Sequence, residues 1–214
     1  MERILFRNVI PSVFVNRNGI DSELWGKELE LKRGSLYLVE AASGKGKSTF
    51  CSYIAGYRSD FTGSILFDDN NTMSLKVADW VGIRRKSISL LFQELRLFPE
   101  LTAFENVEIK NKLTGFKQEK TIREWFERLG IADKMNAKIG LMSFGQQQRV
   151  ALMRALVQPF DFLLADEPIS HLDDQNSKIM GEMMMEEARN QGAAVIVTSI
   201  GKHIELDYER RIKL

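Results

Sequence analysis

Hydrophobic residues along this chain form short runs, separated by stretches with helical spacing. The runs are rich in Val, Ile, Leu and Phe, and they predict strands at 35–40, 64–67, 88–92, 162–165 and 194–198. Residues 3–15 alternate more loosely and also favour strands. Ile122, Trp125, Phe126 and Leu129 recur at spacings of three and four, which predicts a helix over 120–129. Further helices are expected at 48–57, 145–157 and 174–190.

The alternation of strands and helices predicts an α/β fold with a mostly parallel sheet that helices cover on both faces. The pattern from about 95 to 145 is helical instead, which predicts a helical subdomain inserted into the sheet's chain. The loosely alternating N-terminal residues favour a small antiparallel β subdomain. We expect residues 1–214 to form a single domain, with 194–198 as the last strand of its core.

Composition limits the classes of protein that this chain resembles. Apolar residues make up 44% and charged residues 28%, as in ordinary globular proteins, and the formal net charge is +1. That charge gives no support to a nucleic-acid partner. A single cysteine, Cys51, cannot form an intramolecular disulfide, which suits a reducing compartment. No signal peptide or membrane helix is apparent, so we expect any work at a membrane to need another chain.

A phosphate-binding loop is predicted where the strand at 35–40 ends. The pattern Gly, four residues, Gly, Lys, Ser/Thr is intact except that Ala41 takes the first position. Glycines there let successive backbone N–H groups point at phosphate oxygens, and the N-terminus of the following helix adds its dipole. By itself the segment could also be an ordinary glycine-rich turn. The candidate nucleotide-binding residues are Ser43, Gly44, Lys45, Gly46, Lys47, Ser48 and Thr49.

Within this loop, Lys47 is expected to reach the β- and γ-phosphates and Ser48 to ligate magnesium. The pair Asp166-Glu167 ends an apolar strand. A carboxylate at such a place can hold magnesium, often through water, and its neighbour can act as general base on the attacking water. Taken alone, this pair could equally be a solvated acidic turn.

Together with Gln93 and residues 143–146, these motifs resemble the nucleotide-binding subunit of ABC (ATP-binding cassette) transporters, over about residues 30–200. The resemblance implies a P-loop NTPase of ABC type that uses ATP and Mg²⁺. In it, residues 43–49 look like the Walker A loop, Asp166 like the Walker B aspartate and Glu167 like the catalytic glutamate. Gln93 looks like the glutamine that touches magnesium and senses the membrane partner. Lys47, Gln93 and Glu167 are thus expected in the catalytic set, and Ser48, Gln93 and Asp166 around the metal.

Two further segments carry the resemblance. Met142-Ser143-Phe144-Gly145-Gln146 looks like the family's signature motif, in which Ser143, Gly145 and Gln146 would meet the γ-phosphate held by an opposite subunit. Backbone N–H groups at the start of the following helix would form this anion site. Residues 170–173 look like the loop that couples the two sites, with Asp173 among the nucleotide-contacting residues. The resemblance therefore implies a homodimer that forms on ATP binding.

Some positions depart from the family pattern. The usual histidine after the fourth core strand is replaced by Ser199. At this position Ser199 is expected as a fourth member of the catalytic set, although it can hydrogen-bond but cannot carry charge. His203 is a weaker substitute and is expected to be exposed. Phe14 and Trp25 are candidates for stacking on adenine, although neither aligns cleanly. Phe144 and Met142 replace the usual Gly and Leu of the signature.

The sequence therefore favours an ATP-hydrolysing subunit that works from the cytoplasmic face of the cell membrane and drives a separate transmembrane permease. It resembles, loosely, the compact stand-alone subunits of the lipoprotein-releasing, macrolide-export and cell-division types. The permease is expected to contact residues 93–107 and the helical lobe. Ser199 keeps a second hypothesis open, an ATP-gated regulatory or structural clamp with little turnover. A role on ribosomes or DNA is disfavoured, and no nucleic-acid partner is expected.

Overall fold

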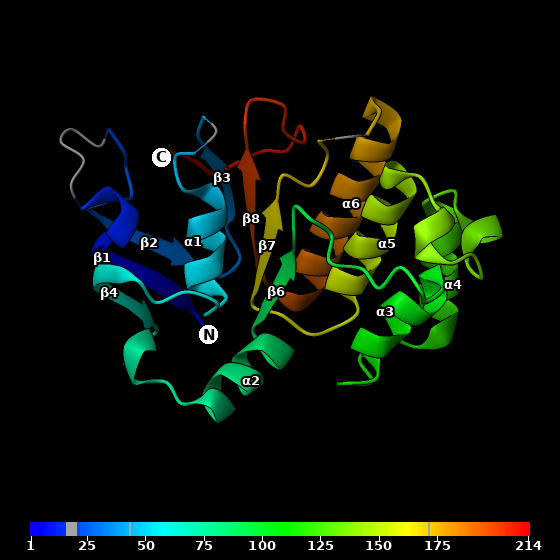
Figure 1. Ribbon diagram of the computed structural model, residues 1–214, viewed down its shortest axis with the longest axis horizontal. Coiled ribbons are helices and arrows are strands. Elements are labelled where there is room, and N and C mark those ends of the chain that lie inside the picture. Colours follow the sequence, from blue (N-terminus) through cyan, green and yellow to red (C-terminus); the bar gives the residue numbers. More distant parts are fainter. Residues whose placement is uncertain (16–20, 43, 171) are drawn as a thin grey trace.

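The computed structural model describes residues 1–15, 21–42, 44–170 and 172–214, which form two sheets and six α-helices within those ranges. The larger sheet is parallel throughout and has the order β6-β7-β8-β3-β9. Its strands are β3 (Leu36–Glu40), β6 (Ile88–Leu91), β7 (Phe162–Asp166), β8 (Ala194–Ser199) and β9 (Arg210–Lys213). The predicted α/β class is confirmed (Figure 1).

The smaller sheet is antiparallel, with the order β2-β1-β4-β5. Its strands are β1 (Arg3–Pro11), β2 (Glu28–Lys32), β4 (Phe61–Phe67) and β5 (Asn70–Asn71). The register between β1 and β4 shifts between Arg7 and Ile10, which marks a bulge. The antiparallel part near the N-terminus was predicted, and the structure adds β2 and β5 to it.

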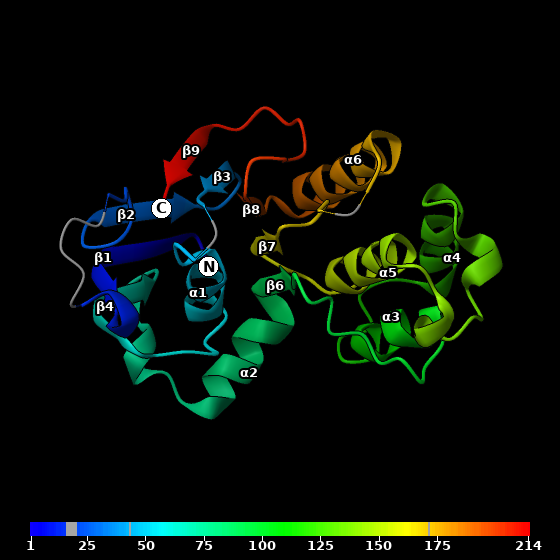
Figure 2. The same ribbon diagram turned by 45° about the horizontal axis from the view of Figure 1, so that its top comes forward.

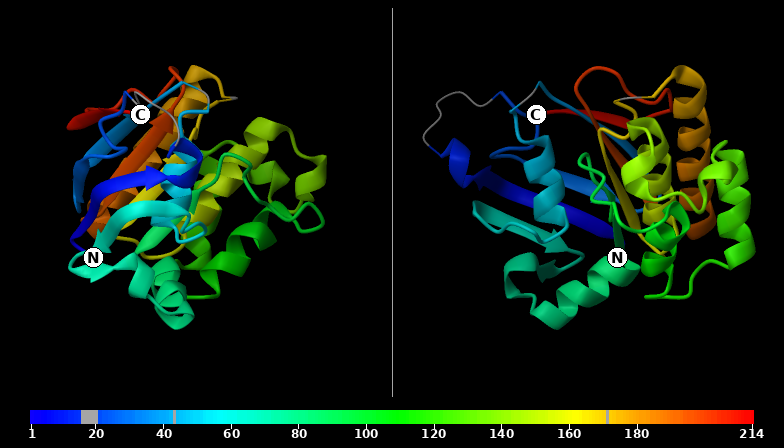
Figure 3. Two further views of the ribbon diagram at one scale, coloured as in Figure 1. Left: turned by 60° about the vertical axis from the view of Figure 1, so that its left-hand side comes forward. Right: turned by 45° about the vertical axis from the view of Figure 1, so that its right-hand side comes forward.

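Six helices connect and cover the sheets. They are α1 (Lys47–Ile54), α2 (Val77–Lys86), α3 (Ala103–Asn111), α4 (Glu119–Arg128), α5 (Phe144–Leu156) and α6 (Asp174–Gln191). Short 3-10 turns occupy Ser12–Phe14, Thr72–Ser74, Ala132–Lys134 and Ile139–Leu141. Figures 2 and 3 show α3, α4 and α5 on the side of the parallel sheet away from β1 and β4. No helix within the described residues is both long enough and apolar enough to cross a lipid bilayer.

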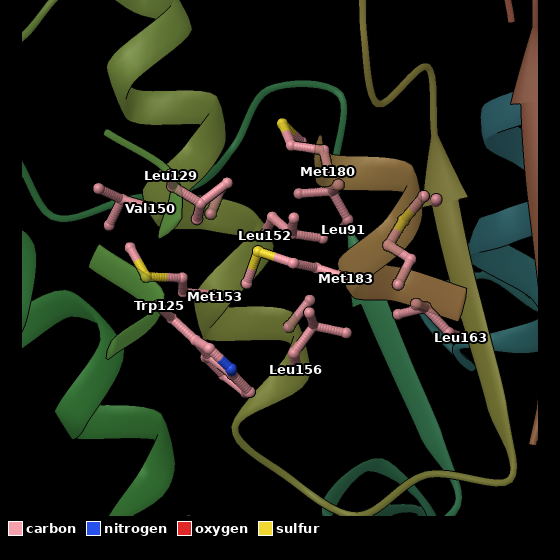
Figure 4. Close-up of a cluster of buried hydrophobic side chains, with 14 of the residues drawn as sticks. Leu91, Trp125, Leu129, Val150, Leu152, Met153, Leu156, Leu163, Met180 and Met183 are labelled. Carbon is pink, nitrogen blue, oxygen red and sulfur yellow. The ribbon is translucent and has the colours of Figure 1, made fainter. Parts of the chain in front are cut away.

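Both faces of the parallel sheet are buried. On one face, Tyr37, Val39 and Ile196 pack with side chains of α1 and of the antiparallel sheet. On the other, strand side chains such as Leu163 pack against α5 and α6, and the same cluster continues into α4 through Trp125 (Figure 4). All five residues of β7 and all six of β8 are buried, which explains why these strands read as continuous apolar runs.

The sequence analysis did not predict two elements, β9 and α2, and the structure gives a physical reason for each omission. β9 follows the strand that we expected to be last, and it pairs with β3. As an edge strand it buries only Ile212, so its sequence carries no apolar run. Helix α2 has no fully buried residue: only Trp80 and Ile83 pack against the core, and both are half-buried, so its apolar pattern is short and weak. The predicted helix at 48–57 is shorter than expected, because it ends at Ile54 and Gly56 then turns the chain at φ +67°.

Gly63 provides a test of the sheet's packing. It lies in β4 at φ +83°, and a Cβ there would overlap the carbonyl oxygens of Arg7 and Asn8 at the β1 bulge. Gly63→Ala should therefore lower the free energy of unfolding by about 1–3 kcal/mol, measured by urea denaturation. Gly82→Ala is the matched control, because Gly82 has no neighbour within 4 Å and lies inside α2. That control should be neutral or slightly stabilising, and an equal loss in both variants would contradict the steric argument.

Candidate active site

The phosphate loop connects β3 to α1, as predicted. Gly44 lies at φ +77° and Gly46 at φ +100°, conformations that L-residues rarely adopt. Gly46 is the N-cap residue of α1, so the N–H groups of Lys47 and Ser48 lie in the first turn, where a helix offers no internal acceptor. Oriented N–H groups at a helix start suit a phosphate. Ser43 lies outside the described residues.

Lys47 is the central cation of this loop. Its side chain is buried, and its ammonium donates to the carbonyl oxygens of Ala41 at 3.0 Å and Ala42 at 3.3 Å. The same ammonium lies 3.7 Å from Glu167 Oε1. These two carbonyl oxygens hold the Lys47 ammonium near the C-terminal end of β3.

Asp166 and Glu167 close the neighbouring strand. The Asp166 carboxylate is buried and accepts a 2.5 Å hydrogen bond at Oδ1 from Thr198 Oγ1 on β8. Glu167 has φ +49°, an uncommon conformation for a residue with a side chain. Its backbone N–H donates to Thr198 O at 3.3 Å and to Thr198 Oγ1 at 3.2 Å. β8 therefore fixes the Asp166 carboxylate and the backbone of Glu167.

Gln93 completes the cluster from a third strand. It follows β6, and its Nε2 donates to Glu167 Oε2 at 3.3 Å. Lys47, Gln93, Asp166 and Glu167 thus converge, because the carboxyl ends of adjacent parallel strands meet at one edge of the sheet. The arrangement brings together the residues that the sequence predicted for chemistry on a phosphate.

The donor set suits a hard cation bound alongside a phosphate. Ser48, Gln93 and Asp166 offer one hydroxyl, one amide and one carboxylate oxygen, the ligand types that Mg²⁺ prefers. Apart from residues 16–20, 43 and 171, the chain contains no group of three or more His, Cys, Asp or Glu side chains placed to hold a metal. Magnesium keeps several water ligands and uses substrate phosphates, so a site for it needs few protein ligands.

Cys51 lies beneath this site and takes no part in it. Burial and the Asp166 charge raise the pKa of its thiol well above the ordinary value. The thiol therefore stays protonated, and Cys51 acts as a small core residue of α1.

The signature residues form a second, separate cluster. Ser143 caps α5: its hydroxyl accepts from Gln146 N at 3.4 Å, and Gln146 Oε1 accepts from Ser143 N at 3.0 Å. Ser143 is exposed and Gly145 is half-buried. In Figure 2, α5 lies on the far side of β6 and β7 from α1. One chain therefore does not bring its own signature residues to its own phosphate loop.

Asp173 belongs to this second cluster. It caps α6, because its carboxylate accepts from Asn176 N at 2.8 Å and Asn176 Nδ2 at 2.6 Å. The backbone N–H of Asn176 is the main reason that the pKa of Asp173 lies below its ordinary value. Arg149 on α5 donates to Asn176 Oδ1 at 3.1 Å, so the start of α6 is tied to the signature helix.

The side chains of Ser199 and His203 both contact backbone carbonyl oxygens of the loop that follows β8. Ser199 is 1% exposed and its hydroxyl donates to Lys202 O at 2.7 Å. Its carbonyl accepts from Ala41 N at 3.2 Å, so it borders the phosphate loop through backbone alone. His203, expected to be exposed, is instead half-buried because its ring packs on Tyr208, with centroids 5.7 Å apart.

The two candidate adenine-stacking residues are buried. Trp25 Nε1 donates to Lys45 O at 3.2 Å, and Phe14 lies against Trp25. A Cβ on Gly46 would approach both rings to within 3.1–3.2 Å. Both rings pack against the phosphate loop, and both are too buried for an adenine to stack on them. The sequence analysis did not predict this packing role. It also did not predict that Thr198 would bind Asp166, because in the sequence Thr198 resembles any polar residue at the end of a strand.

Comparison with known proteins agrees with this geometry. The family model described as "ABC transporter" matches residues 25–170. The lipoprotein-releasing system ATP-binding protein LolD of Myxococcus xanthus is 34% identical over 219 residues, covering 100% of this chain and 96% of the relative. The solved dimeric structure of MJ0796, described as a bacterial ABC transporter cassette, superposes with a TM-score of 0.84 at 28% identity, covering 99% and 94% of the two chains.

A second MJ0796 structure, a post-hydrolysis dimer bound to ADP and Pi, superposes with a TM-score of 0.81 at 29% identity over the same shares of the chains. This chain therefore belongs to the ABC transporter family, and it is an ATP-binding subunit with ATPase activity. The clamp hypothesis is not favoured.

Thr198 tests how the buried carboxylate is stabilised. Thr198→Val removes the hydroxyl that donates to Asp166 and keeps the side-chain shape. Because hydrogen bonds to charged groups are worth about 1.5–3 kcal/mol, we expect the free energy of unfolding at pH 7 to fall by about that amount. Thr198→Ser keeps the donor and should lose less. Equal urea midpoints for the Val and Ser variants would mean that Asp166 does not depend on this bond.

Proposed function

We propose that two copies of this chain close around two ATP molecules and use their hydrolysis to drive a separate membrane protein. The observation that carries the proposal is the division of the site. Lys47, Gln93 and Glu167 meet at one strand edge, whereas Ser143 lies exposed at the start of α5, beyond β6 and β7. A second copy could bring its own Ser143 to this edge and complete it.

Nucleotide binding rests on residues 43–49 in this proposal. The N–H groups of the loop and of the first turn of α1 take the phosphate oxygens, and the Lys47 ammonium neutralises their charge. Ser48, Gln93 and Asp166 would hold Mg²⁺, which would supply positive charge beside the phosphates as negative charge develops there. Thr49 and Lys45 contribute backbone groups.

Hydrolysis rests on Glu167 as general base. Its carboxylate lies within reach of Lys47 and Gln93, so it is oriented before any water arrives. Lys47 is shared between Glu167 and the bound phosphates. The Gln93 amide keeps the Glu167 carboxylate in place when the Lys47 ammonium turns to the phosphates.

In the proposed dimer, the signature residues of each copy contact the nucleotide of the other. Ser143, Gly145 and Gln146 of one copy contact the γ-phosphate held by the other, and Asp173 lies next to this contact. The capping box of Ser143 and Gln146 fixes the start of α5, where the helix dipole favours a negative charge. ATP then acts as part of the interface.

The membrane partner is expected against residues 93–107 and the helices that follow. The chain would work on the cytoplasmic face of the cell membrane, and no nucleic acid is needed. The similarity to LolD, which by its name belongs to a lipoprotein-releasing system, supports a role in such envelope machinery.

Glu167→Gln tests the general-base role. The amide cannot accept the proton, so we expect turnover to fall by at least about 100-fold while ATP binding persists. With ATP and Mg²⁺ present, the variant should accumulate as a dimer in size-exclusion chromatography with light scattering. Glu127→Gln, an exposed carboxylate on α4, is the matched control and should hydrolyse ATP as the parent does. Parent-like turnover by Glu167→Gln would overturn the assignment.

Ser199→Ala distinguishes between two roles of this serine, a catalytic role and a structural role in the loop after β8. The hydroxyl is engaged with Lys202 O, and a neutral hydrogen bond is worth about 0.5–1.5 kcal/mol. Turnover should therefore fall by less than about tenfold, and Ser199→Thr should retain more of it. A loss as large as that of Glu167→Gln, at unchanged thermal stability, would make Ser199 a member of the catalytic set.

A further inference from the structure

Lys202 connects the loop after β8, residues 200–209, to the start of α6. Its ammonium donates to the carbonyl oxygen of Leu172 at 3.2 Å and to Asp174 Oδ1 at 3.1 Å. Figure 1 shows this loop beside the start of α6. Neither Lys202 nor its neighbour Gly201 belongs to a motif that the sequence analysis identified. A side chain of one loop therefore holds the backbone that leads into the next helix.

A turn in the loop after β8 precedes Lys202 and brings it toward α6. Gly201 lies in this turn at φ +109°, a conformation that residues with a side chain rarely adopt. The Ser199 hydroxyl donates to the carbonyl oxygen of Lys202 at 2.7 Å and so closes the turn. The hydroxyl that stands in place of the usual histidine thus shapes the loop that carries Lys202.

The other end of the same loop borders the phosphate loop. Ala41 N donates to the carbonyl oxygen of Ser199 at 3.2 Å, and the carbonyl oxygen of Ala41 accepts from the Lys47 ammonium at 3.0 Å. Ala41 therefore contacts the central cation of the phosphate loop and the loop after β8 at once. The loop after β8 is held at one end by Ala41 and reaches α6 at the other through Lys202.

The segment 172–174 leads in turn to the signature helix. Asp173 caps α6 and accepts from the backbone and the side chain of Asn176. Arg149 of α5 donates to Asn176 Oδ1 at 3.1 Å and to the carbonyl oxygen of Gly145 at 3.1 Å. These hydrogen bonds run from the start of α6 to the residues that the proposed dimer places against the nucleotide of the other copy.

Stability of the fold does not explain the Lys202 contact. The side chains of Lys202 and Asp174 are 54% and 95% exposed, where water screens an ion pair, and an ammonium beside a helix N-terminus opposes the helix dipole. The loop packs on α6 through Ile204 instead, which lies so close to Gly181 that a Cβ there would be 2.5 Å from it. Loss of the Lys202 ammonium should therefore leave the fold intact.

We infer that Lys202 is a positioning residue for ATP hydrolysis, which holds residues 172–174 where a second copy meets them. This role rests on the proposed function, because the contact between copies is that of the proposed dimer. It adds a link within one chain, from the phosphate loop through Ser199 and Lys202 to the start of α6. The carbonyl oxygen of Leu172 is the decisive acceptor, since a bond to the backbone fixes the course of the chain.

Steady-state hydrolysis at several chain concentrations tests this role. Lys202→Met removes the ammonium and keeps an unbranched side chain of similar length. We expect the chain concentration that gives half-maximal turnover to rise roughly tenfold, the loss that one hydrogen bond to a charged group allows. The ATP affinity of the single copy, measured by equilibrium dialysis at low chain concentration, should stay within about twofold, because the phosphate loop keeps its own contacts.

Two further variants separate position from charge. Lys178→Met is the matched control, because Lys178 is an exposed lysine on α6 that lines the same cavity of about 1000 Å³ as Lys202. It removes the same charge and should behave as the parent does. Lys202→Arg keeps a donor for the carbonyl oxygen of Leu172 and should recover at least about half of the lost association. Thermal melting of all three variants should match the parent, which excludes loss of fold as the cause.

Each other outcome has a defined meaning. Parent-like concentration dependence for Lys202→Met, an equal loss in Lys178→Met, or no recovery in Lys202→Arg would overturn the inference and leave the proposed function standing. A loss of ATP affinity in the single copy would also overturn it, because Lys202 would then be a nucleotide-binding cation. If turnover by the parent did not depend on chain concentration, and Glu167→Gln stayed monomeric with ATP, both the proposed dimer and this inference would be wrong.

Discussion

Burial of the parallel sheet on both faces is the constraint on which the rest of the structure depends. β7 and β8 expose no side chain along their length, so polar groups can reach solvent only where these strands end. Asp166, Thr198 and Ser199 are still buried at those ends, and the residues that follow the strands, such as Gln93 after β6, reach solvent. The chemistry is therefore confined to one edge, where the apolar layers hold it rigid.

The sequence predicted the elements that bury side chains and missed those that do not. The strand at 162–165 and the helix at 145–157 were predicted because their apolar patterns reflect real burial. α2 has no fully buried residue and β9 has one, so the burial of these elements leaves only a weak hydrophobic pattern in the sequence. Gly44 and Gly46 were predictable from the loop pattern, and both have the left-handed backbone that the pattern requires. Thr198 and Trp25 were not, since their roles depend on distant residues that happen to fold against them.

The site is held by polar contacts that belong to different parts of the chain. Lys47 bonds its own loop, Asp166 depends on β8, and Glu167 keeps a left-handed backbone that its hydrogen bonds to Thr198 support. Such strain persists only where the surroundings determine it fully. The unusual backbone directs the Glu167 carboxylate toward Lys47 and Gln93, which an ordinary continuation of β7 would not do.

Helix α5 links three functional regions and is packed too well to bend between them. Ser143 caps its first turn, Arg149 reaches Asn176 at the start of α6, and Arg154 holds the backbone after Gln93. From Ser143 to Arg154 the helix spans about 16 Å. Most of its remaining side chains are buried in the core, so α5 moves as a unit or not at all. The start of α5 at Ser143 and the backbone after Gln93, which Arg154 holds, therefore belong to one rigid element.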